Sequence, residues 1–332
     1  MTAKELAKIL NLSAAAVSMA LNNKPGVSTE TRNRVREAAQ QYGMDISRFN
    51  AAPKSKGQID MIFYKKSGAV LTDTPFFLAL TEGVENYCQH TGYSLNIKYV
   101  YDTENVQQKL EDFIYAGAVG FILLGTEMMV EDLHPFAFLD IPIILVDNHF
   151  RSTKMDCVQI NNVDGAFTAT NYLINKKRTQ PGYLHSSYSI TNFEERSDGF
   201  YKAIKHNGMS RSKSVVHTLT PSVEGAYEDM MSIIQNGEEL ASCYFADNDL
   251  IAAGAMKAFR TCGYAIPQDI AVIGFDDMPL CTYVEPTLTT IHVPKKYMGK
   301  MAAERLISII ENKLFYPVNI QVGTNLIKRN SI

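Results

Sequence analysis

Three short segments at the start of the chain carry apolar residues at helical spacing. The first follows Thr2-Ala-Lys-Glu5, in which the Thr oxygen and the Glu side chain can pair with the free N–H groups of a helix N-terminus. Ser13 precedes the second segment, residues 14–21, and Ser28 precedes the third, which extends to Tyr42. Two short helices joined by a tight turn and braced by a third predict a helix-turn-helix in residues 1–43. The second helix is small-sided enough to enter a DNA major groove.

Beyond residue 57 the pattern changes to short apolar runs that alternate with amphipathic segments. The runs typical of strands are 59–64, 94–100, 121–124, 143–146, 181–185, 214–219, 243–246, 271–275 and one near 318–322. The segments typical of helices are 76–91, 105–115, 165–174, 194–207, 224–236, 249–262 and 297–312. This alternation predicts an α/β fold of two doubly wound halves, each with a parallel sheet covered on both faces. A ligand cleft is then expected between the halves, at the carboxyl ends of the strands.

Charge is distributed unevenly along the chain. Residues 1–57 contain nine Lys and Arg against four Asp and Glu, so this part carries +5 and the remainder carries -8 of the net charge of -3. A basic head on an acidic body suits a phosphate backbone at one end only. A charge run can also be a solvated helix face, but the adjoining helix-turn-helix favours DNA.

The sequence gives no indication of catalysis or of a metal or cofactor. The five cysteines, at positions 88, 157, 243, 262 and 281, contain no CxxC pair, and the seven histidines form no pair at ligand spacing. There is no Gly-x-Ser-x-Gly, His-Glu-x-x-His or phosphate-loop motif. No signal-peptide core and no apolar run near the ~20 residues of a membrane span are present. We therefore expect a cytoplasmic protein that is not an enzyme, since scattered cysteines fit a reducing compartment.

The stretch from Val17 to Arg32, VSMALNNKPGVSTETR, resembles the head of the lac repressor family of bacterial regulators. The resemblance continues in DTPFF at 73–77, FADNDL at 245–250, VIGFDD at 272–277 and PTLTTI at 286–291, and is weak only at 44–58. It implies a head (1–43), a hinge or linker (44–57) and a periplasmic-binding-protein-like effector-binding and dimerisation domain (58–332). Subdomain 1 would comprise about 58–160 plus 292–318, and subdomain 2 about 161–291 plus 319–332, so that the last helix returns to the first half.

The resemblance also implies DNA-contacting residues in the head. Alanines at the reading positions admit the helix deep into the groove, although they are also simply good helix formers. Met19 stands where most members carry an arginine, which puts the usual operator sequence in doubt. Arg34 is a further candidate for phosphate contact. The expected DNA-binding set is Ser13, Ala14, Ala15, Ser18, Met19, Asn22, Thr31 and Arg32.

The linker departs from the family pattern of a short helix with a leucine wedge. Pro53 lacks an N–H and biases Ala52 away from helix, and Phe49 is a conceivable wedge for the minor groove. The alternative is an ordinary flexible linker.

In the body, the resemblance places effector contacts on side chains that can bond hydroxyls or stack on a sugar face. Arg196 would fork onto neighbouring hydroxyls or a carboxylate. Phe77 is a stacking candidate beside Phe76, with one of the two expected in the core, and Asp247 would share the position of Asn248. Asn192 and Asn161 are the weaker candidates. Asp249 and Asp277 are interpreted as a helix cap and a turn residue. The expected effector-binding set is Phe76, Asp147, Asn192, Arg196, Asn248 and Asp276.

Together these features predict a sequence-specific DNA-binding transcription regulator, a repressor by resemblance, controlled allosterically by a sugar or sugar derivative. A homodimer on a near-palindromic operator is expected, because no leucine heptad tail follows before Ile332. Three alternatives stay open: a purine-like corepressor, a protein partner in place of a small effector, and a sugar-binding protein whose DNA head is vestigial.

Overall fold

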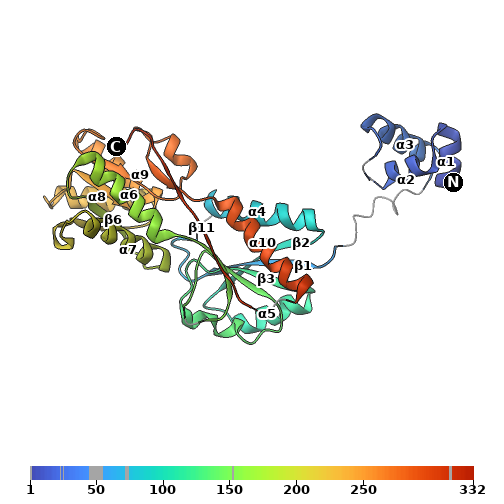
Figure 1. The fold of residues 1–332 in the computed structure, drawn as a ribbon, viewed down its shortest axis with the longest axis horizontal. Coiled ribbons are helices and arrows are strands. Elements are labelled where there is room, and N and C mark those ends of the chain that lie inside the picture. Colours follow the sequence, from blue (N-terminus) through green and yellow to red (C-terminus); the bar gives the residue numbers. More distant parts are fainter. Residues whose placement is uncertain are drawn as a thin grey trace. The chain divides into compact units, whose positions relative to one another are not determined.

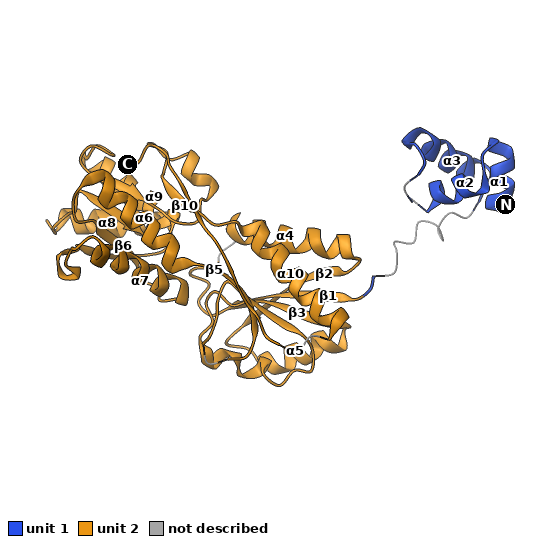
Figure 2. Ribbon diagram, viewed as in Figure 1, with its two compact units in different colours: residues 1–56 blue, residues 57–332 orange. Residues whose placement is uncertain are grey.

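The structure is a computed structural model that describes residues 2–22, 24, 26–44, 55–71, 75–151, 153–313 and 316–332. The chain separates into two compact units, residues 1–56 and 57–332 (Figure 2). The linker predictions for Phe49 and Pro53 lie outside the described residues. No helix within the described ranges is both long and apolar enough to cross a membrane.

The first unit contains the three predicted helices, α1 (Ala3–Leu10), α2 (Ala14–Leu21) and α3 (Thr29–Gln41). The capping box is present, since Thr2 N–H donates to Glu5 Oε2 at 2.8 Å and Thr2 Oγ1 accepts from Glu5 N–H. Ser13 and Ser28 cap the other two helices through their side-chain oxygens. One small core joins all three helices and includes Leu6, Val17, Leu21, Val35 and Ala39. The helix-turn-helix predicted from the apolar spacing is confirmed.

The second unit contains a six-stranded parallel sheet in the order β11-β5-β4-β3-β1-β2 (Figure 1). Its strands are β1 (Gln58–Lys65), β2 (Ser94–Tyr101), β3 (Ala118–Leu124), β4 (Ile143–Val146), β5 (Asp156–Ile160) and β11 (Asn319–Val322). Helices α4 (Pro75–Thr91) and α10 (Lys295–Asn312) pack on one face, with the buried residues Ile59 and Met61. Helix α5 (Val106–Tyr115) and the 3-10 helix η1 (Val130–Phe136) cover the other face.

A four-stranded parallel sheet, ordered β7-β6-β8-β9, forms the second lobe of this unit. Its strands are β6 (Gly182–Ser186), β7 (Val216–Leu219), β8 (Cys243–Ala246) and β9 (Ala271–Ile273). Helices α6 (Asn162–Lys177) and α7 (Thr191–His206) pack together on one face, while α8 (Val223–Gln235) and α9 (Asp249–Thr261) cover the other. Two short 3-10 helices, η2 (Arg211–Lys213) and η3 (Pro279–Thr282), lie in connections. The predicted pair of doubly wound halves is confirmed.

The last helix returns to the first lobe, as expected. Helix α10 packs so closely on α4 that a Cβ on Gly299 would lie 2.0 Å from the Leu80 carbonyl oxygen. A Cβ on Gly83 would meet the Lys296 carbonyl at the same distance, so both glycines are needed for this contact.

One predicted boundary is wrong. Residues 319–332 were assigned to the second half, but β11 pairs in parallel with β5 and so completes the edge of the first sheet. The chain crosses only afterwards, when β12 (Asn325–Ile327) pairs antiparallel with β10 (Thr290–His292). A four-residue strand carries too little pattern to show which sheet edge it will join, because that choice depends on a partner far away in sequence.

Candidate functional site

A cleft opens between the two lobes at the carboxyl ends of their strands. Asp147 follows β4, Asn248 follows β8, and Asp276 lies three residues after β9. The cleft contains about 480 Å³ of space, a volume that includes the solvent at its open mouth. Its walls contain all six residues predicted to contact an effector: Phe76, Asp147, Asn192, Arg196, Asn248 and Asp276.

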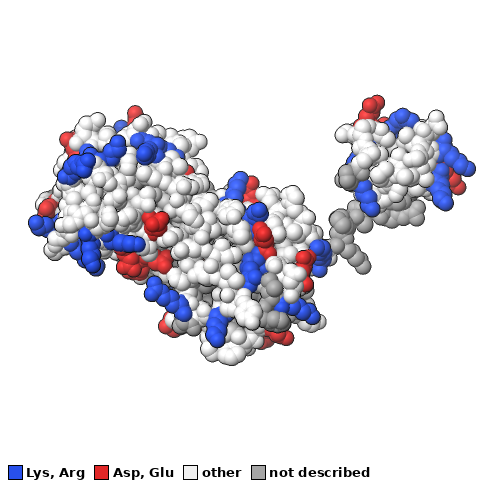
Figure 3. All heavy atoms as spheres, in the orientation of Figure 1, with Lys and Arg blue, Asp and Glu red and all other residues white. Residues whose placement is uncertain are grey.

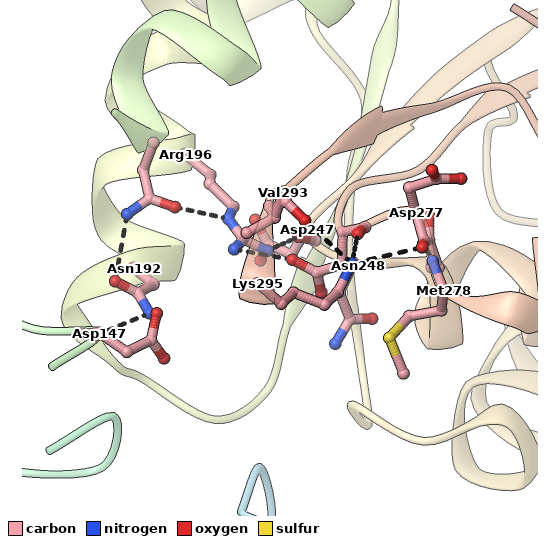
Figure 4. Close-up of polar contacts among 12 residues, drawn as sticks. Asp147, Asn192, Arg196, Asp247, Asn248, Asp277, Met278, Val293 and Lys295 are labelled. Atoms are coloured by element: carbon pink, nitrogen blue, oxygen red, sulfur yellow. Dashed lines mark hydrogen bonds and ion pairs between the residues drawn. The ribbon is translucent and has the colours of Figure 1, made fainter. Parts of the chain in front are cut away.

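Arg196 is the centre of the polar network in the cleft (Figure 4). It extends from α7, is 3% exposed, and its Nη2 donates to Asp276 Oδ1 at 3.1 Å. Its Nε donates to Asn162 Oδ1 at 2.9 Å, and Nη1 donates to the Asp247 carbonyl. The guanidinium carbon lies 3.8 Å from the centre of the Phe275 ring. These contacts on every side fix the plane of the guanidinium before any ligand arrives.

Polar contacts also bridge the two lobes across the cleft. Asn192, in the first turn of α7, donates from Nδ2 to the Asp147 carbonyl at 3.2 Å, while its Oδ1 accepts from Asn162. His149 Nδ1 of the first lobe faces Glu195 Oε1 of the second at 3.7 Å. The Arg196–Asp276 bond in the second lobe and Asp147 in the first lobe therefore belong to one hydrogen-bonded network.

The two cleft aspartates are held in an unusual electrostatic and conformational state. Burial raises the pKa of Asp147 to about 6, with the Asp276 carboxylate adding to the rise and Thr126 and Arg196 opposing it. Burial also raises the pKa of Asp276, although Arg196 and Lys295 oppose the shift. Both residues have positive φ, 62° for Asp147 and 108° for Asp276. Charge crowding and backbone strain of this kind concentrate at binding sites.

Apolar side chains supply the remaining walls. Phe76 and Phe77 at the start of α4 are both buried and both line the cleft, with ring centres 5.1 Å apart. Sequence reasoning did not identify Val70, Thr126, Ile190, Phe193, Leu250 and Met278 as lining residues. Of these, Thr126 alone had a local signal, because it lies two residues after the end of the buried strand β3, next to Gly125.

Several weaker candidates have structural roles. The Asp247 carboxylate points away from the cleft and accepts hydrogen bonds from Tyr183, His185 and the Ser186 N–H, so it is not an effector contact of the kind expected. Asn161 caps α6 by accepting from Asp164 N–H at 2.9 Å and does not line the cleft. Both positions lie at strand ends, but the direction of a side chain there is decided by its neighbours.

The adjacent aspartates Asp249 and Asp277 also point elsewhere. Asn248, not Asp249, caps α9, so the cap assignment is wrong by one residue. Asp249 is fully buried and accepts from Met278 N–H and from Thr290. Asp277 has φ 52°, as expected of a turn residue, and pairs with Arg329 and His292.

In the head, α2 presents one open face. Val17, Ala20 and Leu21 are buried, which turns the opposite side of the helix outward. The predicted contacts on that side are exposed at Ser13, Ala14, Ala15, Ser18 and Asn22, and partly exposed at Met19. Met19 lies over the turn that follows, since a Cβ on Gly26 would be 3.1 Å from its sulfur. On the visible face of the head, Lys and Arg side chains lie at several places along its margin, with Asp or Glu beside some of them (Figure 3).

The candidates on α3 are held by internal hydrogen bonds. The Thr31 hydroxyl pairs with Ser28 Oγ at 2.8 Å, and Arg32 Nη2 donates to the Lys24 carbonyl at 2.9 Å. Arg34 Nη2 donates to the Leu10 carbonyl at the end of α1. The bonds of Thr31 and Arg32 position the turn between α2 and α3, and that of Arg34 joins α3 to the end of α1, in addition to any contact with DNA.

Comparison with known proteins agrees with this architecture. Residues 2–44 match the model for bacterial regulatory proteins of the lacI family, and residues 170–332 match a periplasmic binding protein-like domain. The chain is 30% identical over 334 residues to the transcriptional regulator GalS of Salmonella typhimurium, covering all of this chain and 96% of that protein. It is 28% identical to GalR of Escherichia coli, covering 100% and 95%.

Solved structures share the fold. A complex of the regulator CelR with cellobiose superposes with a TM-score of 0.74 at 21% identity, covering 100% of this chain and 99% of that one. The lac repressor bound to ONPG gives 0.73 at 18% identity, also covering 100% and 99%. The chain therefore belongs to the LacI family of bacterial DNA-binding transcription regulators, which join a helix-turn-helix head to a ligand-binding domain and are not enzymes.

Proposed function

We propose that this protein is a cytoplasmic repressor that binds its operator as a homodimer and responds to a sugar or similar small polar effector in the interlobe cleft. The observation that carries the proposal is the convergence of the six predicted side chains on one cavity between two lobes. Aromatic rings beside carboxylate, amide and guanidinium groups suit a ring with one apolar face and several hydroxyls.

The names of relatives support a sugar as the effector. Structures with the same fold were solved with cellobiose and with ribose, and GalR and GalS are among the similar sequences. PurR proteins are similar to a comparable degree, so a purine-like corepressor remains the alternative that a ligand panel must include.

The head is proposed to read DNA with the outer face of α2. Ala14 and Ala15 are exposed and small, so the helix axis can approach the base edges and their methyl groups can touch thymine. Ser18 and Asn22 would bond phosphates or bases, and Arg32 would support the backbone contact. Met19 cannot grip guanine with two hydrogen bonds as an arginine can, so we expect an operator without that contact.

A homodimer is supported by an apolar surface on the first lobe. Strand β2 is the outer strand of its sheet, and its side chains Ile97, Tyr99 and Tyr101 are 46%, 43% and 43% exposed. Leu78 on α4, which packs against β2, is 72% exposed. An open strand edge beside exposed apolar groups is a common protein–protein contact.

Coupling between effector binding in the cleft and DNA binding by the head would arise from the arrangement of the two lobes. An effector that contacts Asp147 on one lobe and Arg196 on the other favours one lobe arrangement over others. If the paired first lobes set the spacing of the heads, effector and operator change each other's affinity reciprocally, typically by ~1–3 kcal/mol.

The experiment is fluorescence anisotropy with the DNA upstream of the protein's own gene, at two salt concentrations, with and without sugars and purines. Steeply salt-dependent, specific binding that one sugar changes is expected. Ala15→Glu should abolish DNA binding, while Gln40→Glu, an equal charge change at an exposed position of α3, should weaken it only slightly. No specific binding at low salt would refute the DNA-binding proposal, and a response to purines alone would replace the sugar.

A further inference from the structure

The cationic donors near the cleft are already committed to the protein. An ammonium has three N–H donors, and Lys295 Nζ donates to three backbone carbonyls, those of Asp276, Asp277 and Val293. Arg196 has five N–H donors, and each of its three nitrogens already donates once within the protein. Figure 4 shows both cations surrounded by these acceptors. An incoming anion would therefore meet no open ammonium and only part of one guanidinium.

The carboxylates, in contrast, retain free capacity as acceptors. Among the described residues, the Asp147 carboxylate accepts a hydrogen bond from Thr126 at 2.7 Å through one oxygen and also interacts with the Asn192 side chain. Asp276 accepts from Arg196, also through one oxygen. An ionised carboxylate has about four acceptor positions, so each group can still accept from a ligand.

The balance of charge around the cleft is negative. The Arg196–Asp276 pair cancels, and Lys295 is the second cation next to it. Against these stand the buried Asp147 and Asp249, while Asp247 is paired with His185. Burial and the Asp276 charge raise the pKa of Asp249 to about 7, and burial raises the pKa of Asp147 to about 6, with the Asp276 charge adding to the rise and Arg196 opposing it.

We infer that the cleft selects effectors without negative charge, namely uncharged or amine-bearing sugars, and rejects their phosphorylated and carboxylate forms. The ligand supplies hydroxyl or ammonium protons to the open oxygens of Asp147 and Asp276, from opposite lobes. An added phosphate or carboxylate would be placed among like charges, with only the remaining N–H groups of Arg196 as cationic donors, and its binding would be weakened. This inference rests on the proposed sugar-binding function and narrows its ligand class.

The test is calorimetric titration of the full-length protein with three sugars, glucose, galactose and mannose. Each sugar is tested in four matched forms: neutral, 2-amino, 6-phosphate and uronic acid. For whichever of the three sugars binds as the effector, the neutral or the amino form should bind most tightly. The phosphate and the uronic acid should bind at least about a hundredfold more weakly. An anionic form that binds most tightly would overturn the inference and leave the sugar-responsive regulator intact.

Two variants locate the origin of the selectivity. Asp147→Asn keeps the size and an acceptor for Thr126 but removes the charge, and should reduce the gap between neutral and anionic forms to about tenfold or less. Asp198→Asn removes an exposed charge from the same helix as Arg196 and should leave the gap unchanged. A full gap in Asp147→Asn would overturn the assignment to this carboxylate. Binding by no sugar in any form would instead refute the sugar effector itself, and the wild-type series decides this whether or not the variants fold.

Discussion

The outer face of α2 and the interlobe cleft are both candidate contact surfaces, but they hold their side chains in opposite ways. On α2, Ala14 and Ala15 are exposed, and Ser18 makes only a local bond with Asn22. In the cleft, Arg196 is nearly inaccessible and bonded to residues from several elements. Exposed side chains of α2 such as Ser18 should therefore affect DNA contact alone, whereas side chains of the cleft should affect stability and ligand binding together.

The largest effect is expected for Arg196→Met. The change leaves Asp276 without its cation and the Asp247 carbonyl without a donor, so the free energy of unfolding should fall by about 3–5 kcal/mol. Ser18→Ala in the head should change it by no more than about 0.5 kcal/mol. Urea unfolding measures both, and the double variant Arg196→Met/Asp276→Asn should recover part of the loss. Losses that simply add would contradict the coupling of this pair.

Asp147→Asn, unlike Arg196→Met, should raise the free energy of unfolding at alkaline pH. Burial raises the folded-state pKa of Asp147 from 3.8 to about 6, so the protonated form stabilises the fold below pH 3.8 and this stability is lost as the pH rises through 6. Asparagine stays neutral, so the variant should be more stable than the wild type by about 2–3 kcal/mol at pH 8. The difference should be small at pH 4. Arg196 and Asp276 face the same carboxylate, and an equal difference at both pH values would argue against this account.

Glu127→Gln should cost about 2 kcal/mol, because the carboxylate anchors the loop that follows β1. Glu127 is 2% exposed and its oxygens accept backbone N–H bonds from Lys66, Ser67, Gly68, Val70 and Leu71. These bonds outweigh burial and lower its pKa below 4.5. The stability is therefore present above pH 4.5 and is lost as the pH falls through the folded-state pKa.

Thermal unfolding of the wild type and Glu127→Gln from pH 7 to pH 3 tests this prediction, since the two curves should converge in acid. Glu5→Gln is the matched control in the head, where the same side-chain type closes an exposed capping box. Glutamine can keep that box, so little change is expected there. A pH-independent gap for Glu127→Gln would rule out the carboxylate as its cause.

The smallest expected effect comes from removing one helix cap, and it tests whether the two compact units unfold independently. Ser13→Ala removes the cap of α2 and should destabilise the head by about 1 kcal/mol, which weakens DNA binding but leaves effector affinity unchanged. Ser222→Ala removes the cap of α8 in the second lobe and should destabilise only the body. Differential scanning calorimetry should show each variant shifting one transition. A shared shift would mean that the units do not unfold independently.

Much of the architecture could be predicted because it depends on local chemistry. The bounds of α2 and β4 were predicted to the residue, since a serine cap or an apolar run bounded by turns acts over a few neighbours. The six effector candidates lie at strand ends or in the first two turns of a helix. They could be predicted because the family resemblance marks those positions and parallel strands bring their carboxyl ends together.

Only the tertiary structure decided how these residues are paired. The Arg196–Asp276 bond joins positions 80 residues apart, and β11 finds its partner β5 across more than 150 residues. The sequence places Asp147, Asp247 and Asp276 alike at strand ends, yet Asp247 turns toward Tyr183 while the other two enter the cleft. Local sequence determines where a polar side chain emerges from an element. Its direction, its partners and its charge state depend on burial and hydrogen bonds supplied by distant segments, because only packing of the whole unit brings those groups within reach.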